Sequence, residues 1–317
     1  MRHIFVVNPM AGKHKARKQL VPKLNSFISQ KGLDAEIYIT TGVGDCERFV
    51  RERSKSDELI RFYACGGDGT LGEATNGIFG AKNKELAVIP IGTGNDFVRS
   101  FNNKEFFSEL ENQVEGSAEP IDLICCKTDS RITYSINMIN IGFDCDVAAK
   151  IQDLKRLPLI SGSFSYYLGI IITLFSRMGK GFSTKLSDKT EHRGEYLLVS
   201  VGNGSYCGGG FCASPKSDLK DGLLDLMMVK KVSRLDFISL IGRYKVGEHI
   251  EEKYSKGLIT YLAQPSVTIE PLNQMKVCID GEIFNMEKME LSTVGKAVLF
   301  SIPKGSSLKI QKEMIKL

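Results

Sequence analysis

The residues with the clearest chemical potential form a glycine-rich loop with one acid, Gly66-Gly67-Asp68-Gly69-Thr70. The loop follows a strand-like run, LIRFYAC, and precedes a helical pattern. Glycine lets backbone N–H groups approach phosphate oxygens closely, and the N-terminus of a following helix adds positive potential. The Asp68 carboxylate would repel a polyphosphate unless a divalent cation lay between them. The loop predicts a site for a nucleotide with Mg²⁺; a tight strand-to-helix turn without a ligand is the structural alternative.

A second small-residue loop, Gly92-Thr93-Gly94-Asn95-Asp96-Phe97, follows the next strand-like run, LAVIPI. Neighbouring strands of a parallel sheet end at the same edge, so we expect the two loops to lie side by side. The Thr93 hydroxyl is predicted to bond a phosphate. For Asn95 and Asp96 the pattern favours capping of the next helix.

Other nucleotide-binding patterns fit less well. Gly67, Gly69 and Gly72 satisfy G-x-G-x-x-G, but the pattern alone is weak, and the next strand does not end in the acid that would hold a ribose. A Walker A loop is absent from the sequence, since Gly12-Lys13-His14 lacks the Ser or Thr that binds the metal. The four histidines form no close pair, which argues against a zinc helix or a histidine-based mechanism.

The elements that position these loops alternate between strand and helix in the first third of the chain. This alternation predicts a parallel sheet covered on both faces, with ligands bound at the carboxyl ends of its strands. The predicted order is HIFVVNP, a helix near 16–30, AEIYIT, a helix near 45–54, LIRFYAC, a helix near 71–79, and LAVIPI.

After Asp122 the chain changes to longer strand-like runs separated by turns, which favours a mainly antiparallel second domain. Residues 148–177 suggest helices, interrupted by Pro158 and Gly162. Two interpretations of this segment stay open, a lid or lipid-facing wall and ordinary core helices. The antiparallel runs are RITYSINMINIGF, GEYLLVSVGNG, GLLDLMMVKKV, SVTIEP, MKVCIDGE and KAVLFSI.

Composition places few restrictions on function. The 317 residues are 42% hydrophobic and 25% charged, with a net charge of +5. Basic clusters near both ends suit phosphates or an anionic membrane surface, or are solvated helix faces. The N-terminus has no secretory signal pattern, and the most apolar window, 166–175, is about half of the ~20 residues that span a bilayer. We therefore expect a cytoplasmic protein with peripheral membrane contact at most.

Taken together, these motifs resemble those of the bacterial diacylglycerol-kinase and sphingosine-kinase-like lipid kinases. The resemblance rests on order and spacing over nearly the whole chain. It implies an α/β, two-domain lipid-kinase fold, with a three-layer α/β nucleotide domain at 1–126, a β-rich sandwich domain at 127–299 that holds the lipid acceptor, and a return of 300–317 to the first domain. The active site would lie in the cleft between them. The matching segments are Asn8-Pro9 with Gly12, Gly66 to Thr70, Gly92 to Phe97, Asp221-Gly222-Leu223-Leu224-Asp225 and Asp280-Gly281-Glu282.

The resemblance also implies roles for individual residues. Asp221 is similar to a ligand of a structural Mg²⁺, with the backbone carbonyls of Asp218 and Leu223 as companions. Asp68, Asp122 and Asp280 are similar to the acidic network around the catalytic metal. The residues implied to contact ATP are Asn8, Pro9, Gly12, Lys13, Thr40 (or the adjacent Thr41), Gly66, Gly67, Asp68, Gly69, Thr70, Leu71, Gly72 and Thr93.

Glu282 matches the general base of the family, and its chemistry agrees, because a carboxylate can accept the proton of an attacking hydroxyl. From the residues alone, Asp280-Gly281 is equally a hairpin-turn signal. Two positions depart from the family pattern: Gly72 stands where Asn is usual, and Gly94 replaces a more common Ala or Thr. Both loops still permit phosphate contact.

The combined prediction is an ATP- and Mg²⁺-dependent lipid kinase that phosphorylates the hydroxyl of a membrane lipid and binds no nucleic acid. Diacylglycerol leads among acceptors, ahead of phosphatidylglycerol, sphingoid and undecaprenol-like alcohols. The alternatives are a soluble small-molecule kinase, such as one acting on NAD, and a non-catalytic nucleotide-sensing module at the membrane. A homodimer is compatible with the fold, but no sequence feature demands one.

Overall fold

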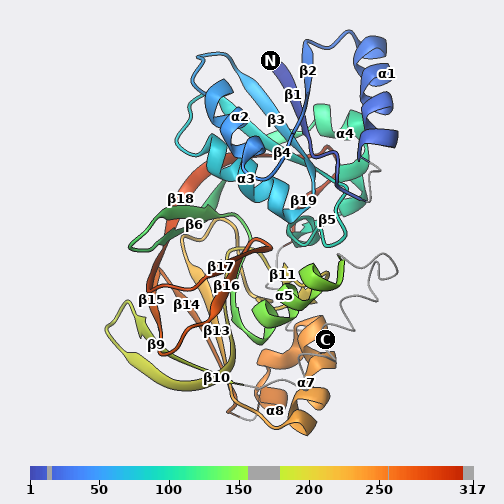
Figure 1. Cartoon of the computed structure of the whole chain (residues 1–317). Helices are drawn as coiled ribbons and strands as arrows, with labels where there is room; N and C mark the ends of the chain where they lie inside the picture. Colours follow the sequence, from blue (N-terminus) through green and yellow to red (C-terminus); the bar gives the residue numbers. More distant parts are fainter. Residues whose placement is uncertain (13–15, 156–178, 256, 310–317) are drawn as a thin grey trace. The chain divides into compact units, whose positions relative to one another are not determined.

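The computed structural model describes residues 1–12, 16–155, 179–255 and 257–309, and the chain divides into two compact units (Figure 1). Unit 1 consists of Met1–Leu123 and Gly295–Lys309, and unit 2 contains Ile124–Val294. The changes between units fall inside β6 (Ser117–Lys127) and β18 (Met289–Ile302).

Unit 1 is built on a parallel sheet in the order β2-β1-β3-β4, and the end of β18 joins β4 in parallel. The central strands are nearly continuous apolar runs, as expected for strands buried on both faces. The strands are β1 (Arg2–Val7), β2 (Ala35–Ile39), β3 (Ile60–Gly66) and β4 (Lys84–Pro90).

Helices cover both faces of this sheet, as Figure 1 shows. On one face, Phe5, Tyr63 and Cys65 form a buried core with side chains of α1 (Val21–Lys31) and α4 (Leu110–Val114). On the other lie α2 (Asp45–Arg53) and α3 (Asp68–Ile78), which pack so closely that a Cβ on Gly77 would come 2.7 Å from the carbonyl oxygen of Glu47. The remaining short elements are η1 (Ala16–Leu20), η2 (Phe97–Ser100), β5 (Phe101–Asn102), η3 (Lys104–Ser108) and β19 (Ser307–Leu308).

Unit 2 is an antiparallel β structure. Its strand order is β17-β16-β8-β10-β9-β15-β18, with β13 pairing both β10 and β14, and β6 pairing β7. The strands are β7 (Ile132–Ser135), β8 (Met138–Gly142), β9 (Lys180–Leu186), β10 (Glu191–Gly202), β11 (Tyr206–Cys207), β12 (Phe211–Cys212), β13 (Leu224–Lys230), β14 (Ile259–Gln264), β15 (Ser266–Pro271), β16 (Lys276–Ile279) and β17 (Glu282–Asn285).

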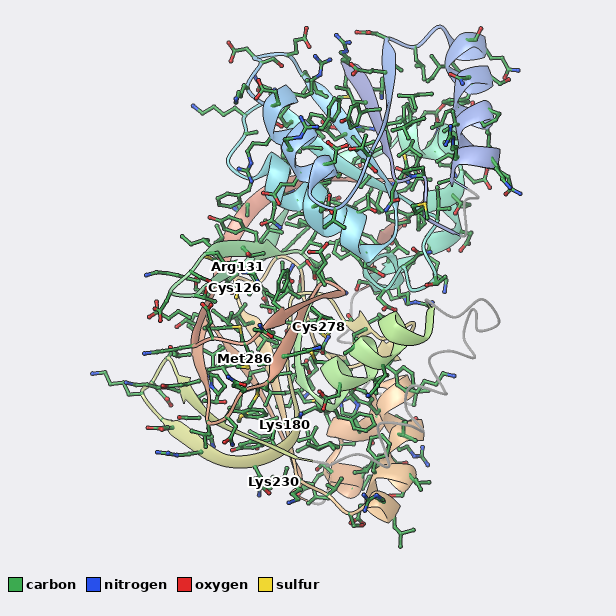
Figure 2. The ribbon with its side chains drawn as sticks, in the orientation of Figure 1. Cys126, Arg131, Lys180, Lys230, Cys278 and Met286 are labelled. Carbon is green, nitrogen blue, oxygen red and sulfur yellow. The ribbon has the colours of Figure 1, made fainter. Side chains whose placement is uncertain are left out.

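Alternate residues of the central strands of unit 2 enter two different cores. On β13, Leu226 and Met228 belong to a core formed by strands and the loops between them, which also contains Cys126 and Met286 (Figure 2). Met227 and Val229 of the same strand face a second core, which includes Phe143 of α5 (Phe143–Lys155) and Phe237 of α7 (Arg234–Val246). The sheet is therefore covered by strands on one side and by helices on the other.

The structure confirms the predicted fold class, and it corrects some local predictions. RITYSINMINIGF was expected as one strand-like run, but it is broken into β7 and β8 at Ile136 and Asn137. The predicted helical segment at 148–177 begins within α5, and residues 156–178 lie outside the described part of the chain. The sequence did not predict α7, nor the short η4 (Glu248–Ile250) and α8 (Glu252–Ser255) that follow it.

Among the described residues, no helix combines the length and the apolar composition of a membrane span.

Candidate functional site

Residues of the predicted nucleotide site gather at the carboxyl ends of the strands of unit 1. Asn8 follows β1, and its side-chain amide donates to the Thr70 hydroxyl oxygen at 3.1 Å. The backbone N–H of Asn8 donates to the carbonyl of Cys65 at 3.0 Å. These two bonds join the loop after β1 to the end of β3 and to the first turn of α3.

The two glycine loops contact each other through their backbones. The N–H groups of Ile91 and Gly92 donate to the carbonyl oxygen of Gly66 at 2.8 and 3.1 Å. A Cβ on Gly92 would lie 2.5 Å from the Cα of Gly67, and a Cβ on Gly66 would lie 2.3 Å from the Thr70 hydroxyl oxygen. Only glycine permits these approaches. The prediction that the loops lie side by side is confirmed.

Asp68 connects the first loop to the second. Its Oδ1 accepts a hydrogen bond from the N–H of Asp96 at 2.8 Å, and the N–H of Phe97 lies 3.4 Å away. Burial raises the pKa of Asp68 above its usual range, although these backbone bonds work in the opposite direction. The carboxylate therefore lies at the N-terminus of α3 with its orientation set by the neighbouring loop.

Gly94 gives space to two carboxylates. A Cβ at this position would come 2.9 Å from Oδ2 of Asp68 and 3.4 Å from Oδ2 of Asp96. The departure from the family pattern at Gly94 therefore has a steric reason in this chain. Arg99 offsets part of this negative charge, because its Nε lies 3.3 Å from Oδ1 of Asp96, and a hard divalent cation would offset the rest.

The predicted capping role of Asn95 and Asp96 is wrong. Asn95 takes a positive φ of 50°, and its side-chain amide donates to the carbonyl of Gly92 at 2.8 Å, inside the second loop. Asp96 stands at the N-cap of the short 3-10 helix η2 but makes no side-chain cap bond there. The N–H of Arg99, which a capping side chain would bind, donates instead to the backbone carbonyl of Asp96 at 3.1 Å, and the Asp96 carboxylate lies 3.3 Å from Nε of Arg99.

The neighbouring threonines after β2 have separate roles. Thr40 is buried, and its hydroxyl lies 3.4 Å from the carbonyl oxygen of Val7. Thr41 donates through both its N–H and its hydroxyl to Asp45, at 2.8 and 2.9 Å, at the start of α2. The hydroxyl of Thr41 is thus committed to a local structural bond.

The other predicted nucleotide contacts are distributed along the same edge. Gly12 adopts a positive φ of 61° in the loop after Pro9, and Thr93 is exposed in the second loop. Gly69 lies in the first turn of α3, where Leu71 and Gly72 are buried. Lys13 lies outside the described residues.

In unit 2, Asp280 and Gly281 form a two-residue hairpin turn. Both have positive φ, 46° and 89°, and the flanking residues Ile279 and Glu282 pair across it. This is the geometry of a type I′ turn, so the hairpin interpretation of Asp280-Gly281 is confirmed. Glu282 is the first residue of β17 and is partly exposed.

The Asp280 carboxylate holds the break between β7 and β8. Its Oδ1 accepts three hydrogen bonds, from the Ser135 hydroxyl at 2.8 Å and from the N–H groups of Asn137 and Met138 at 3.1 and 2.9 Å. Its Oδ2 accepts one, from the N–H of Ile136 at 2.9 Å. Burial raises the pKa of Asp280 to about 6, against the effect of these bonds. The structure thus gives Asp280 a structural function that the sequence did not predict.

Asp122, the third acid of the predicted catalytic network, is buried in β6. Its Oδ1 accepts a hydrogen bond from the N–H of Lys296 in β18 at 2.7 Å. Asp68 and Asp122 belong to unit 1 and Asp280 to unit 2.

The predicted structural metal segment is a loop that leads into β13. Asp218 and Asp221 are exposed, and each accepts a hydrogen bond from the backbone N–H two residues later in the chain. Asp218 accepts from Lys220 at 3.0 Å, and Asp221 accepts from Leu223 at 2.9 Å. The nearby Asp225 is buried and accepts from the Tyr261 hydroxyl at 2.7 Å.

Charge supports the fit of this loop to a cation. Burial raises the pKa of Asp225 to about 7, and the charges of Asp221 and Asp218 add to this shift. Carboxylate and carbonyl oxygens are the ligands that Mg²⁺ prefers. Within the described residues, however, no group of three or more His, Cys, Asp or Glu side chains has the arrangement of a complete metal site.

One polar pair in unit 2 was missed. The Tyr244 hydroxyl of α7 donates to Oδ2 of Asp144 at the start of α5, at 2.5 Å, and burial raises the pKa of Asp144 to about 6. The two residues are 100 positions apart, and no local motif announces their contact.

Comparison with known families assigns both parts of the chain. Residues 2–126 match the diacylglycerol kinase catalytic domain, and residues 137–299 match the YegS C-terminal NAD kinase beta sandwich-like domain.

Known proteins match nearly the whole chain. A diacylglycerol kinase of Bacillus subtilis is 28% identical over 303 residues, covering 95% of this chain and 96% of the relative. A "Probable lipid kinase YegS-like" protein of Shewanella frigidimarina is 27% identical and covers 90% and 89%. The crystal structure of a diacylglycerol kinase from Bacillus anthracis shares the fold, with a TM-score of 0.67 at 23% identity over 94% and 96% of the two chains. The chain therefore belongs to the diacylglycerol kinase and YegS-like family of lipid kinases.

Proposed function

We propose that this protein transfers the γ-phosphoryl group of MgATP to the hydroxyl of a membrane lipid, with diacylglycerol as the leading acceptor. The observation that carries the nucleotide part is the contact between the two glycine loops of unit 1, with the Asp68 carboxylate between them. The B. subtilis relative supports diacylglycerol as acceptor by its name.

In this proposal, the open N–H groups at the start of α3 bind phosphate oxygens, supported by the helix dipole. Asn8 holds Thr70, and thereby the first turn, in position. Asp68 and Asp96 hold the divalent cation that accompanies the nucleotide, which supplies charge neutralisation at the phosphates.

Glu282 acts as the general base. The acceptor hydroxyl oxygen bonds to the γ-phosphorus, the bond from that phosphorus to the β,γ-bridging oxygen breaks, and ADP leaves. The hydroxyl proton passes to the Glu282 carboxylate. Asp221 and the backbone carbonyls of Asp218 and Leu223 hold a second, structural Mg²⁺ that fixes the loop before β13.

The test is a phosphoryl-transfer assay with γ-labelled ATP, Mg²⁺ and mixed micelles of single candidate lipids. We expect label in the organic phase with diacylglycerol, and its near-complete loss in Glu282→Gln with ATP affinity retained. Retained turnover in Glu282→Gln would overturn the base assignment.

A soluble acceptor is the second candidate, because the model that matches residues 137–299 is described as NAD kinase beta sandwich-like. The same assay with NAD in place of lipid separates the two. Label in NAD, with none in any lipid, would replace the lipid kinase proposal.

A further inference from the structure

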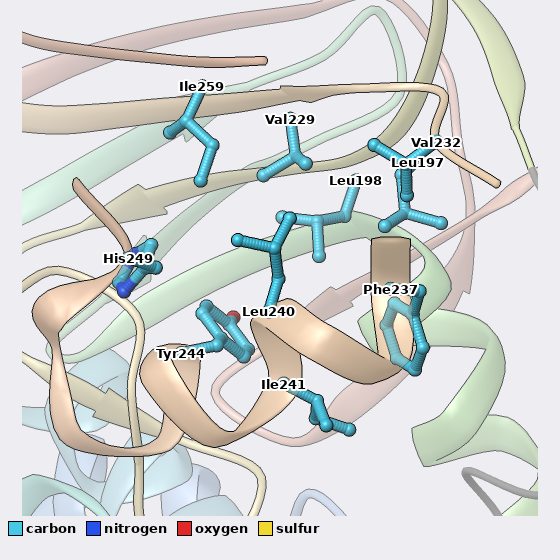
Figure 3. Close-up of a pocket in the computed structure, with 10 residues that line it drawn as sticks. All are labelled: Leu197, Leu198, Val229, Val232, Phe237, Leu240, Ile241, Tyr244, His249 and Ile259. Atoms are coloured by element: carbon cyan, nitrogen blue, oxygen red, sulfur yellow. The ribbon is translucent and has the colours of Figure 1, made fainter. Parts of the chain in front are cut away.

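Helix α7 has two apolar faces. The inner face contributes Phe237, Leu240, Ile241 and Tyr244 to a cavity of about 30 Å³ beneath the helix (Figure 3). The other side of this cavity is formed by residues of β10, β13 and β14 and the segments beside them: Leu197, Leu198, Val229, Val232, His249 and Ile259. Inward-facing apolar residues are what a helix packed on a sheet requires.

The outer face of α7 is also apolar. The exposed fraction is 79% for Leu235, 57% for Ile238 and 52% for Val246. With Gly242, these residues follow each other at spacings of three and four, so they share one stripe of the helix. Single exposed hydrophobic residues are ordinary on soluble proteins, but three on one face of a thirteen-residue helix require a reason.

The helix itself and the end of β13 before it carry a net positive charge. Residues 230–246 contain five basic side chains, Lys230, Lys231, Arg234, Arg243 and Lys245, and a single acid, Asp236. Asp236 interacts with the Ser233 cap of the helix. From neighbouring elements, Glu195 pairs with Lys231 at 2.6 Å, and Glu248 pairs with Arg243. Two more acids follow the helix, Glu251, which pairs with Lys253 at 3.0 Å, and Glu252. Figure 2 shows Lys230 at the end of β13, just before α7.

We propose that the outer face of α7, defined by Leu235, Ile238 and Val246, is the surface by which this protein docks on an anionic lipid bilayer. An apolar stripe beside basic side chains is the pattern of a helix that lies in the membrane interface, with its cations among anionic headgroups. This inference rests on the proposed function, since it brings the enzyme to the surface that contains its acceptor.

A second copy of the chain is the other occupant to consider. A two-fold contact through this face would place the basic residues of one α7 against those of the other. Juxtaposed like charges oppose such a contact, whereas phosphate headgroups of a bilayer would neutralise them. The charge distribution therefore favours the membrane.

The experiment is sedimentation of the full chain with vesicles of phosphatidylcholine alone or with one third phosphatidylglycerol. We expect binding to the anionic vesicles and weakening by 0.5 M NaCl. Leu235→Ser with Ile238→Ser should lower the partition constant about tenfold or more. Ile132→Ser is the matched control, because Ile132 of β7 has the same exposed fraction of 57% as Ile238.

Two results would overturn the docking surface. One is equal vesicle binding by the double variant and the wild type, or an equal loss in the Ile132→Ser control. The other is a concentration-dependent dimer that the double variant abolishes while vesicle binding is unchanged, which would assign the face to a second copy.

A turnover assay separates this inference from the proposed function. On a monodisperse short-chain diacylglycerol the double variant should match the wild type, while on anionic vesicles it should be several-fold slower. Vesicle binding through α7 without phosphorylation of any lipid would overturn the function and leave the surface intact. Lipid phosphorylation that is equally fast in the double variant on vesicles would overturn the surface alone.

Discussion

Two aspartates in glycine-containing turns, Asp68 in unit 1 and Asp280 in unit 2, both accept hydrogen bonds from backbone N–H groups of a distant segment. Asp280 is buried and uses both carboxylate oxygens on residues 135–138. Asp68 is partly exposed, and its Oδ2 lies beside Gly94 and a second carboxylate. The difference shows that an acid in a family motif can serve the fold, so its place in the motif does not by itself identify it as a chemical residue.

The largest effect is expected for Asp280→Ala, which tests whether Asp280 stabilises the fold. Four donors would lose their acceptor in a buried place, so we expect the free energy of unfolding to fall by about 4 kcal/mol. Urea denaturation followed by circular dichroism measures the change. Asp280→Asn, which keeps one acceptor oxygen, should lose less. Unchanged stability together with lost turnover would instead make Asp280 a catalytic residue.

Gly92→Ala tests whether the two loops of unit 1 need their backbone contact. The new Cβ would lie 2.5 Å from the Cα of Gly67, so the loops must separate. We expect a loss of about 2–3 kcal/mol in stability, with weaker ATP binding, by denaturation and calorimetry. Gly42→Ala is the control, since its Cβ would meet no atom within 4 Å. Equal effects of the two substitutions would show that loop contact is unimportant.

Asp68→Asn tests whether the charge of Asp68 is needed for MgATP binding and not for the stability of the fold. Asn keeps an oxygen for the N–H of Asp96, so the fold should be nearly unchanged, with a stability loss below about 1 kcal/mol. The lost charge should weaken MgATP binding about 30-fold, or about 2 kcal/mol, and ATP binding without Mg²⁺ much less. Titration calorimetry with and without Mg²⁺ decides this. Mg²⁺ dependence equal to that of the wild type would make Asp68 structural, like Asp280.

Asp144 extends the comparison to a third acid, which accepts from the Tyr244 hydroxyl. Its pKa is raised to about 6 by burial, so its contribution to stability is present below pH 4 and is lost as pH rises through 6. Relative to the wild type, Asp144→Asn should therefore gain about 2–3 kcal/mol between pH 4 and pH 7.

The wild type and Asp144→Asn must be compared at each pH, because two histidines change the stability of both proteins in the same range. The pKa values of His3 and His249 are lowered to about 4, so their contribution to the free energy of unfolding increases as pH rises, opposite to that of Asp144. Denaturation curves at several pH values measure the difference. A difference that does not change with pH would show that Asp144 titrates normally.

The strands, helices and loops of unit 1 were largely predictable because their signals are local. Apolar runs marked the strands, and glycine pairs marked the turns that end them. Helix α7 was not predictable, because apolar residues on both its faces leave no single stripe of period 3.6. The break between β7 and β8 was equally hidden, since Asp280, which holds it, lies more than 140 residues further along the chain.

By itself, the sequence determined the alternating order of unit 1, the positions of both glycine loops, the Asp280-Gly281 hairpin and the family. Each depends on the conformational range of a few adjacent residues or on the order of short motifs. Only the tertiary structure decided that Asp68 bonds the second loop, that Gly94 makes room for two carboxylates, and that α7 exposes an apolar stripe. Those features depend on which distant segments meet and which faces stay uncovered, and no spacing within a motif encodes either.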